Sequence, residues 1–241
     1  MSNIEKKQFD QVTKTLDNWQ GRSEWFFNRE FTDKYEDYYE GPYKRAEIWQ
    51  KKTLAKLIQK DQRVKNLLEF GCGTTRFTRW WNEIGIDAMG ADISPFMLAQ
   101  GIRLFDGDLV LADSHHMPFK DNSFDALAFI ATFAYYNDPV KVIREALRVG
   151  RYGMLFGIMN RNSPKVVRRR VQEAFGKNKY YETAKFYTPK KLIEKIHEAL
   201  DGRLYTIEWT STGLPKWFPV QQWGLPVGDF FGLYVKMTDV E

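Results

Sequence analysis

The sequence predicts an α/β fold with a seven-stranded, mostly parallel sheet and helices on both of its faces. Short apolar runs alternate with longer runs of helical spacing, and a long Pro- and Trp-rich loop separates the last two apolar runs. The expected strands are residues 66–70, 87–91, 108–112, 124–130, 152–158, 203–210 and 229–237. The expected helices are residues 76–84, 95–103, 138–148, 164–176 and 189–200. The alternation favours parallel strands joined by helices, and the long final loop favours a C-terminal antiparallel hairpin.

The first sixty residues lie outside this alternation and predict a helical extension. They are rich in Trp, Tyr and Phe, and a break between helices is expected at Gly41-Pro42. Apolar side chains at helical spacing predict one helix over residues 43–59 that packs beside the sheet. These side chains are Ile48, Leu54, Leu57 and Ile58.

Acidic residues stand at the ends of three successive strands: Glu69, Asp92 and Asp113. Because ligands of open α/β sheets bind at the carboxyl ends of the strands, we expect these acids to line one binding edge. Gly71 and Gly73 follow the first strand and predict a tight turn that exposes backbone amides to a nucleotide-like ligand. The third glycine of a dinucleotide-binding fingerprint is absent, which weakens that particular interpretation.

Composition and charge restrict the class of protein. The chain has 241 residues, a formal net charge of +5 and one cysteine, Cys72. No apolar run approaches the roughly 18 residues that a membrane-spanning helix needs, and the first seven residues are polar, unlike a secretory signal. A single cysteine cannot form an intrachain disulfide, which suits a reducing compartment. We therefore expect a cytoplasmic protein in which Cys72 is a small buried packing residue.

Three stretches of the chain resemble the class I S-adenosylmethionine-dependent methyltransferases, and within them the small-molecule type-11 group. They are Leu68-Glu69-Phe70-Gly71-Cys72-Gly73-Thr74, Gly90-Ala91-Asp92-Ile93-Ser94, and the run from Asp113 to Asp125. The last is the most specific, because it combines an acid, Met117-Pro118-Phe119 and Asp121-Asn122-Ser123-Phe124-Asp125 at the family's spacing. The resemblance covers roughly residues 60–236. It implies a Rossmann-like sheet, S-adenosylmethionine as the cofactor and methyl transfer (EC 2.1.1.-) as the reaction.

The resemblance also implies a domain organisation. We expect a single methyltransferase domain over residues 1–241, in which residues 1–60 form an N-terminal helical extension or lid. Residues 61–241 form the cofactor-binding core. No internal repeat and no clean linker divides the chain, and this length is common for one α/β domain.

The chemistry of a sulfonium nucleoside assigns roles to the acids and glycines. Asp92 can accept hydrogen bonds from the ribose hydroxyls, and Asp113 from the exocyclic amine of adenine. Amides around Gly71 and Gly73 are expected to meet the methionine portion, while Glu69 holds the turn or the methionine amino group. The expected cofactor-binding set is Glu69, Gly71, Cys72, Gly73, Asp92, Ile93, Asp113, Ser114 and Ile130. The alternative for each acid is a helix cap.

One position departs from the family pattern. The family usually has a third glycine where this chain has Thr75. A β-branched residue tolerates positive φ badly. We therefore expect a reshaped turn around the methionine portion, with cofactor binding retained.

The methyl acceptor is expected where aromatic residues follow the fourth strand. Tyr135 and Tyr136 either line the acceptor pocket or are ordinary loop aromatics. Related enzymes often bring a tyrosine from the N-terminal region to the active site, which implies a role for Tyr35, Tyr38 or Tyr39. The candidate catalytic residues are Tyr135 and Tyr39. A general base is needed only if the accepting atom is protonated at working pH.

Two aromatic clusters predict either a lid over an apolar acceptor or a satellite core under a long loop. The first contains Trp25, Phe26, Phe27, Tyr35, Tyr38, Tyr39 and Tyr43, and the second runs from Trp209 through Trp217 and Phe218 to Trp223.

The three histidines favour structural roles. His115 and His116 follow the adenine-side acid and are expected to pack or to meet the adenine edge, because this loop runs away from the methyl group in the family's layout. His197 lies inside the late helix. These residues do not form a persuasive metal-ligand set, so no metal is expected.

A basic stretch over residues 165–191 leaves two interpretations open. It contains Arg168, Arg169, Arg170, Lys177, Lys179, Lys185, Lys190 and Lys191. Interleaved Val166, Val167, Val171 and Phe175 favour the solvated face of an amphipathic helix, and the alternative is contact with an anionic substrate or RNA. A methyltransferase of small, partly apolar molecules is therefore favoured. The alternatives are an RNA or protein methyltransferase, or a non-catalytic binder that keeps the cofactor fold.

Overall fold

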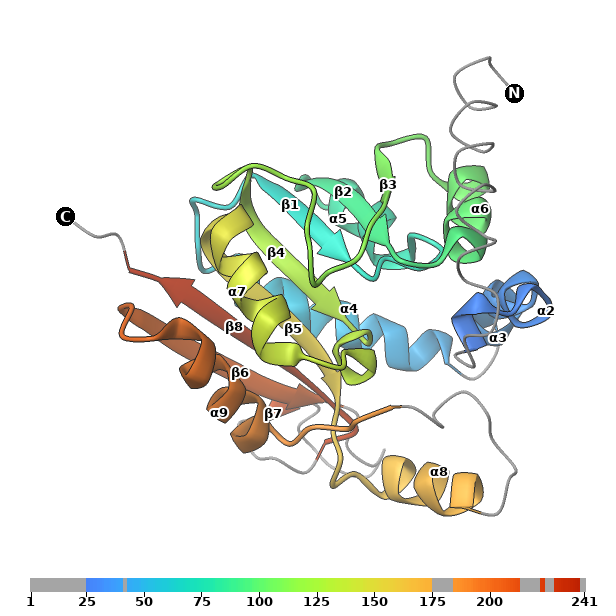
Figure 1. Cartoon of the computed structure of the whole chain (residues 1–241). Helices are drawn as coiled ribbons and strands as arrows, with labels where there is room; N and C mark the ends of the chain where they lie inside the picture. The colour runs from blue at the N-terminus through green and yellow to red at the C-terminus, as the bar shows by residue number, and fades with distance from the viewer. Residues whose placement is uncertain (1–24, 41–42, 175–183, 213–221, 224–227, 239–241) are drawn as a thin grey trace.

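The computed structural model describes residues 25–40, 43–174, 184–212, 222–223 and 228–238 (Figure 1). One sheet runs through it in the strand order β3-β2-β1-β4-β5-β8-β6-β7. Its strands are β1 (Asn66–Phe70), β2 (Asp87–Asp92), β3 (Leu109–Leu111), β4 (Phe124–Ile130), β5 (Gly150–Met159), β6 (Tyr205–Thr212), β7 (Gln222–Trp223) and β8 (Phe230–Met237). The first five are parallel, whereas β8 is antiparallel to both β5 and β6.

This topology confirms the predicted α/β class, the mostly parallel sheet and the C-terminal antiparallel pair. β8 inserts between β5 and β6, so β6 is the outer strand of that pair. The two-residue strand β7, which pairs Trp223 with Ser211 of β6, is an addition to the seven expected strands. The long loop between β6 and β8 therefore contributes to the sheet edge as well as connecting the pair.

Helices cover both faces of the sheet (Figure 1). The short helices η2 (Trp25–Phe27), α2 (Arg29–Asp33) and α3 (Tyr35–Glu40) precede α4 (Lys44–Ile58). The later helices are α5 (Arg76–Glu83), α6 (Pro95–Leu104), η3 (Phe133–Tyr135), α7 (Pro139–Val149), α8 (Pro164–Ala174) and α9 (Pro189–Leu200). Residues 1–24, the predicted break at Gly41-Pro42 and the expected end of α8 at residue 176 lie outside the described residues.

Alternating side chains of the strands form two hydrophobic cores. On β1, Leu67 packs with Leu57 of α4 and Trp81 of α5, whereas the neighbouring Leu68 packs in the core that contains α7 and α9. This alternation follows from the period of two in a strand. Both faces are apolar because helices cover both. None of the helices in the described residues is long and apolar enough to cross a membrane.

Local signals determine where α6, α7 and α9 begin. Each has proline in its first turn, where the missing N–H costs nothing. The residue before it accepts a hydrogen bond from the third residue of the helix: Ser94 from Met97, Asp138 from Lys141, and Thr188 from Lys191. The expected starts near residues 95, 138 and 189 are therefore correct to within one residue.

The predicted amphipathic pattern of α8 is wrong in part. Val166 is buried, but Val167 is 47% exposed and Val171 is 52% exposed. Residues 167 and 171 are one helical turn apart and share a face, whereas residue 166 is rotated by about 100° from residue 167. The outer face of α8 therefore carries two valines among the exposed side chains of Arg168 and Arg170. Phe175 lies outside the described residues.

Candidate functional site

The turn after β1 has three residues in the left-handed region: Gly71 at φ 78°, Gly73 at φ 56° and Thr75 at φ 69°. The amides of Gly71 and Cys72 both donate to the carbonyl of Ala91, at 2.7 and 3.0 Å, which ties the turn to β2. A Cβ on Gly71 would lie 2.2 Å from Thr132 Oγ1, whereas one on Gly73 would meet only Met97 Cε at 3.8 Å. Gly71 therefore permits close packing, and the surface above Gly73 is open.

The expectation of a reshaped turn at Thr75 rested on the poor fit of a β-branched residue to positive φ, yet Thr75 adopts a positive φ. Thr75 takes the left-handed conformation that glycine favours, at φ 69° and ψ 19°, which costs a non-glycine residue about 1–2 kcal/mol. Its side chain is buried, and its Oγ1 donates to the carbonyl of Thr74 at 2.6 Å. Its methyl group lies where Gly101 of α6 has no Cβ, since such an atom would be 2.9 Å away. Burial of the side chain offsets the conformational cost.

Asp92 joins the first turn to the entry of α6. Its Oδ2 accepts from the Gly73 amide at 2.8 Å and its Oδ1 from the Ser94 amide at 2.7 Å. The side chain is 6% exposed, and burial raises its pKa to about 6 although these amides oppose the shift. The helix-cap alternative fails here, because Ser94 is the N-cap of α6. The carboxylate therefore lies at the expected cofactor edge.

Glu69 lies beneath the turn and is 1% exposed. Its Oε2 accepts from Thr78 Oγ1 of α5 at 2.6 Å. Burial raises the pKa of Glu69 to about 8; the hydrogen bond from Thr78 opposes the shift, and the negative charge of Asp92 adds to it. This carboxyl is consequently mostly uncharged at neutral pH, and a cation placed beside it would favour its ionised form.

Asp113 follows β3 and is held by His115. Its Oδ1 accepts from the His115 amide at 2.9 Å and lies 2.7 Å from His115 Nδ1. Burial acts to raise the pKa of Asp113, but the hydrogen bonds from His115 outweigh it, and the pKa lies below its usual value. The His115 ring also contacts the edge of Tyr136, with ring centroids 5.9 Å apart. His115 therefore packs on the predicted adenine side.

The other expected cofactor residues lie around the same edge. Cys72 is buried in the turn, and burial raises the pKa of its thiol well above the usual value, as expected of a packing residue. Ser114 is buried beside Tyr136, Ile130 is buried at the end of β4, and Ile93 is partly buried after Asp92. Within the described part of the chain, no group of three His, Cys, Asp or Glu side chains could hold a metal ion.

Tyr135 meets the N-terminal segment 25–40, which contains η2, α2 and α3. The indole Nε1 of Trp25 donates to Tyr135 Oη at 3.2 Å, and the Phe26 ring contacts Tyr135 edge-on at 5.5 Å. Ser94 Oγ donates to the carbonyl of Phe26. The segment is therefore docked on the carboxyl edge of the sheet, next to α6 (Figure 1).

Tyr39 lies elsewhere in this segment. Its hydroxyl is 3.2 Å from that of Tyr35, and the guanidinium of Arg76 lies over its ring at 4.5 Å. No described contact joins Tyr39 directly to Tyr135. The side chains of Tyr38 and Trp223, and residues Trp217 and Phe218, lie outside the described residues.

Sequence reasoning did not identify three polar residues beside the turn: Thr78, which binds Glu69; Thr132, which packs on Gly71; and Glu36, which reaches the turn from α3. No local pattern marks them, because their roles arise from contacts between distant segments.

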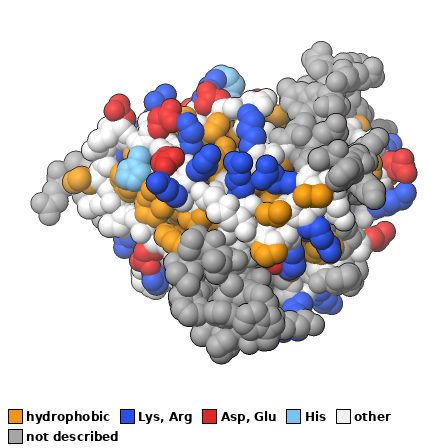
Figure 2. Space-filling model, turned by 90° about the horizontal axis from the view of Figure 1, so that it is seen from below, with side chains coloured by type: hydrophobic (Ala, Val, Ile, Leu, Met, Phe, Trp, Pro, Cys, Tyr) orange, Lys and Arg blue, Asp and Glu red, His pale blue; other side chains and the backbone are white. Residues whose placement is uncertain are grey.

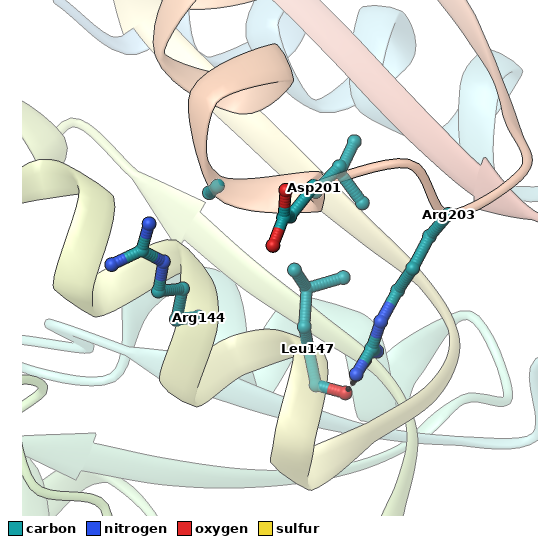
Figure 3. A pocket seen from close by; sticks show the side chains of 6 residues that line it. Arg144, Leu147, Asp201 and Arg203 are labelled. Carbon is teal, nitrogen blue, oxygen red and sulfur yellow. Dashed lines mark hydrogen bonds between the residues drawn. The ribbon is translucent and has the colours of Figure 1, made fainter.

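A cavity of about 290 Å³ lies apart from this site (Figure 3). It is lined by Arg144, Leu147, Ala199, Leu200, Asp201 and Arg203. Leu147 is near the C-terminal end of α7, where β5 begins, so the cavity is at the opposite edge of the sheet from the acids. Arg203 Nη1 donates to the carbonyl of Leu147 at 3.4 Å. The cavity therefore contributes nothing to the candidate site.

The carboxyl edge fits S-adenosylmethionine by its chemistry. The open surface above Gly73 lets a ligand approach the backbone, and the Asp92 carboxylate can accept hydrogen bonds from a diol. The buried, mostly uncharged Glu69 is a carboxyl that a cationic ligand would stabilise in its charged form.

Comparison with known proteins agrees with this geometry. Residues 68–156 match the family model described as a methyltransferase domain. An uncharacterized protein of Methanocaldococcus jannaschii is 30% identical over 169 residues, which cover 69% of this chain and 78% of that protein. A demethylmenaquinone methyltransferase of Renibacterium salmoninarum is 33% identical over 90 residues, but these span only 37% of this chain and 38% of that enzyme.

The fold agrees with solved structures as well. A crystal structure of an S-adenosylmethionine-dependent methyltransferase from Thermotoga maritima superposes with a TM-score of 0.66 and 20% identity, over 89% of this chain and all of that one. The fold is therefore that of the class I methyltransferases. With the matched motifs, the chain belongs to the type-11 group of the S-adenosylmethionine-dependent methyltransferases. It is an enzyme that uses S-adenosylmethionine.

Proposed function

We propose that the protein transfers a methyl group to a small, partly apolar molecule that binds under the N-terminal segment 25–40. The observation that carries the proposal is the contact of Trp25 and Phe26 with Tyr135. Aromatic side chains from the N-terminal segment 25–40 and from the loop after β4 can enclose an apolar acceptor. The proposal treats residues 1–241 as one domain, with residues 1–60 as lid and residues 61–241 as cofactor-binding core.

The proposed cofactor contacts follow the strand ends. Asp92 binds the ribose, Asp113 the adenine amine, and Glu69 supports the methionine end. The backbone of Gly71, Cys72 and Gly73 lies against the methionine portion while its amides stay bound to Ala91 and Asp92, and Ile93, Ser114 and Ile130 line the nucleoside. When bound, S-adenosylmethionine supplies a methyl group on a sulfonium sulfur, which is a good leaving group.

The residues near the acceptor act by alignment and by exclusion of water. The Trp25 indole donates to Tyr135 Oη and thereby orients that ring at the carboxyl edge. Tyr39 belongs to the same docked segment and is proposed as a second residue of the acceptor pocket. The partial match to a demethylmenaquinone methyltransferase supports a small-molecule acceptor.

Titration calorimetry and a transfer assay test this proposal. The purified protein should bind S-adenosylmethionine and its demethylated product, S-adenosylhomocysteine, and should transfer labelled methyl to apolar aromatic acceptors from a panel. Tyr135→Phe and Trp25→Ala should reduce transfer while cofactor affinity is retained. Cofactor binding with no transfer to any acceptor would support a non-catalytic binder instead, and the absence of cofactor binding would overturn the proposal entirely.

A macromolecular acceptor is the second candidate, and the outer face of α8 favours it. Val167 and Val171 are exposed there among Arg168 and Arg170. Figure 2 shows Lys and Arg side chains gathered with hydrophobic ones on the underside of the molecule. RNA binding that weakens steeply with salt, together with methyl transfer to that RNA, would establish this candidate.

A further inference from the structure

Charged side chains from three helices meet beside the cofactor turn. Arg76, the first residue of α5, donates from Nη1 to Glu36 Oε2 of α3 at 2.7 Å and from Nε to Glu47 Oε2 of α4 at 3.2 Å. Arg79 lies 3.7 Å from the same oxygen of Glu36. The guanidinium of Arg76 thus connects the N-terminal segment to the helix that begins directly after the turn.

The two carboxylates that share Arg76 differ in how firmly they are held. Glu47 has a second partner, Lys51, at 2.7 Å, and its side chain is 9% exposed on a helix that packs into the core. The Glu36 side chain is 29% exposed on the short helix α3. Glu47 can therefore hold Arg76 by itself, and Glu36 is the partner that docking of segment 25–40 adds.

Glu36 also touches the turn itself. Its second oxygen, Oε1, accepts from the hydroxyl of Thr74. Thr74 is buried between Gly73 and Thr75, both in the left-handed region, and the Gly73 amide donates to Asp92. The position of the Thr74 hydroxyl therefore depends on the same backbone conformation that joins the Gly73 amide to Asp92.

We propose that Glu36 is a positioning residue that couples the docking of segment 25–40 to the geometry of the cofactor turn. With the turn in its binding conformation, Thr74 and Arg76 both donate to Glu36 and hold the segment down, with Trp25 against Tyr135. Without the charge of Glu36, the turn still binds the cofactor, but this binding no longer strengthens the docking of segment 25–40. The inference rests on the proposed function, in which this segment covers the acceptor.

Hydrogen exchange of the amides of residues 25–40, measured with and without S-adenosylhomocysteine, tests the coupling. In the wild-type protein the ligand should slow exchange in this segment. Glu36→Gln should lose at least about tenfold of that protection, the scale of a lost hydrogen bond between charged groups. Because docking and binding are linked, its affinity for S-adenosylhomocysteine by calorimetry should fall by about the same factor. Thr74→Val should lose protection in the same segment.

Asp37→Asn is the matched control, because Asp37 is an exposed acid on the same helix. It should retain the wild-type protection. Wild-type protection in Glu36→Gln, or a loss of protection equally large in Asp37→Asn, would overturn the inference. Exchange and product binding are measured without any acceptor. Failure of the acceptor proposal therefore appears separately, as absent methyl transfer by the wild-type enzyme.

Discussion

Two carboxyl groups, Glu69 and Asp92, lie at or next to the last residues of adjacent parallel strands, and both are buried. Each therefore retains its proton to a higher pH than it would in the unfolded chain, with a pKa of about 8 for Glu69 and about 6 for Asp92. Their environments still differ. Asp92 accepts from two backbone amides, whereas Glu69 accepts from the Thr78 hydroxyl. A neutral Glu69 and an amide-bound Asp92 can hold different parts of one ligand.

The raised pKa of Glu69 predicts a pH dependence of stability. The folded state binds the proton of Glu69 more tightly than the unfolded chain does, so protonation of Glu69 stabilises the fold. This stabilisation is complete below about pH 4.5. That effect is lost as pH rises through about 8. Glu69→Gln keeps the acceptor for Thr78 and removes the titration. In thermal unfolding of the ligand-free proteins, the stability of the variant relative to wild type should rise between about pH 5 and pH 8. A constant difference across this range would contradict the assignment.

Asp92→Ala should weaken binding of S-adenosylhomocysteine by about 1.5–3 kcal/mol, because charge-assisted hydrogen bonds are lost. It should also lower thermal stability, since the amides of Gly73 and Ser94 lose their acceptor. Asp125→Ala is the matched control: Asp125 is also buried and accepts from the amides of Lys65 and Asn66, at the opposite edge of the sheet. Calorimetry should find affinity reduced only in the Asp92 variant.

At the scale of elements, the turn after β1 depends on the sheet and on α6 together. The carbonyl of Ala91 in β2 accepts two amides of the turn, and Thr132 after β4 packs against Gly71. Gly101 of α6 leaves room for the Thr75 methyl group. Three elements thus constrain one turn, and this is why a β-branched residue can adopt a conformation that its own preferences oppose.

Alanine at Gly71 and at Gly73 should have different effects. At Gly71 the new Cβ would overlap Thr132, so the free energy of unfolding should fall by about 2–5 kcal/mol, from overpacking and left-handed strain together. At Gly73 strain alone should cost about 1–2 kcal/mol, while affinity for S-adenosylhomocysteine drops because the methyl group enters the open surface. Urea unfolding and calorimetry measure the two quantities.

Gly85→Ala separates strain from binding. Gly85 has φ 86° and no atom within 4 Å of a new Cβ, and it lies beyond α5. Its alanine variant should show the cost of the left-handed conformation with cofactor affinity unchanged. Equal affinities of Gly73→Ala and Gly85→Ala for S-adenosylhomocysteine would show that the cofactor does not bind at the turn.

At the scale of the whole molecule, the carboxyl edge of one continuous sheet collects residues that are far apart in the chain. The docked segment 25–40 meets the turn, the start of α6 and Tyr135. The basic outer face of α8 is a separate feature, and no described contact joins Arg168 or Arg170 to this edge. Charge on that face should therefore be separable from methyl transfer to a small acceptor.

The double variant Arg168→Glu/Arg170→Glu tests this separation. Transfer to small apolar acceptors should stay within about threefold of wild type, because exposed charges contribute little at a distance. It should also change little between about 50 and 200 mM salt. Transfer to RNA, in contrast, would fall steeply with salt and with the charge reversal. A small-acceptor activity that collapses in the double variant would show that α8 belongs to the acceptor site.

The alternation of strands and helices could be predicted from the sequence because it depends on local periodicity and on local caps. Pro95, Pro139 and Pro189 mark helix starts that are correct to within one residue. The exposure of Val171 on α8 could not be predicted, because periodicity shows which residues share a face but not which face meets the core. The cofactor residues remain predictions from the strand ends and the family resemblance.

The α/β class, the methyltransferase family and the cofactor follow from the amino-acid sequence alone, since short motifs and periodic patterns are local in the chain. The left-handed conformation of Thr75, the packing of Thr132 on Gly71 and the contact of Glu36 with Thr74 and Arg76 became visible only in the folded chain. These contacts join residues distant in sequence. Their energies depend on burial and on exact distance, which no local pattern encodes.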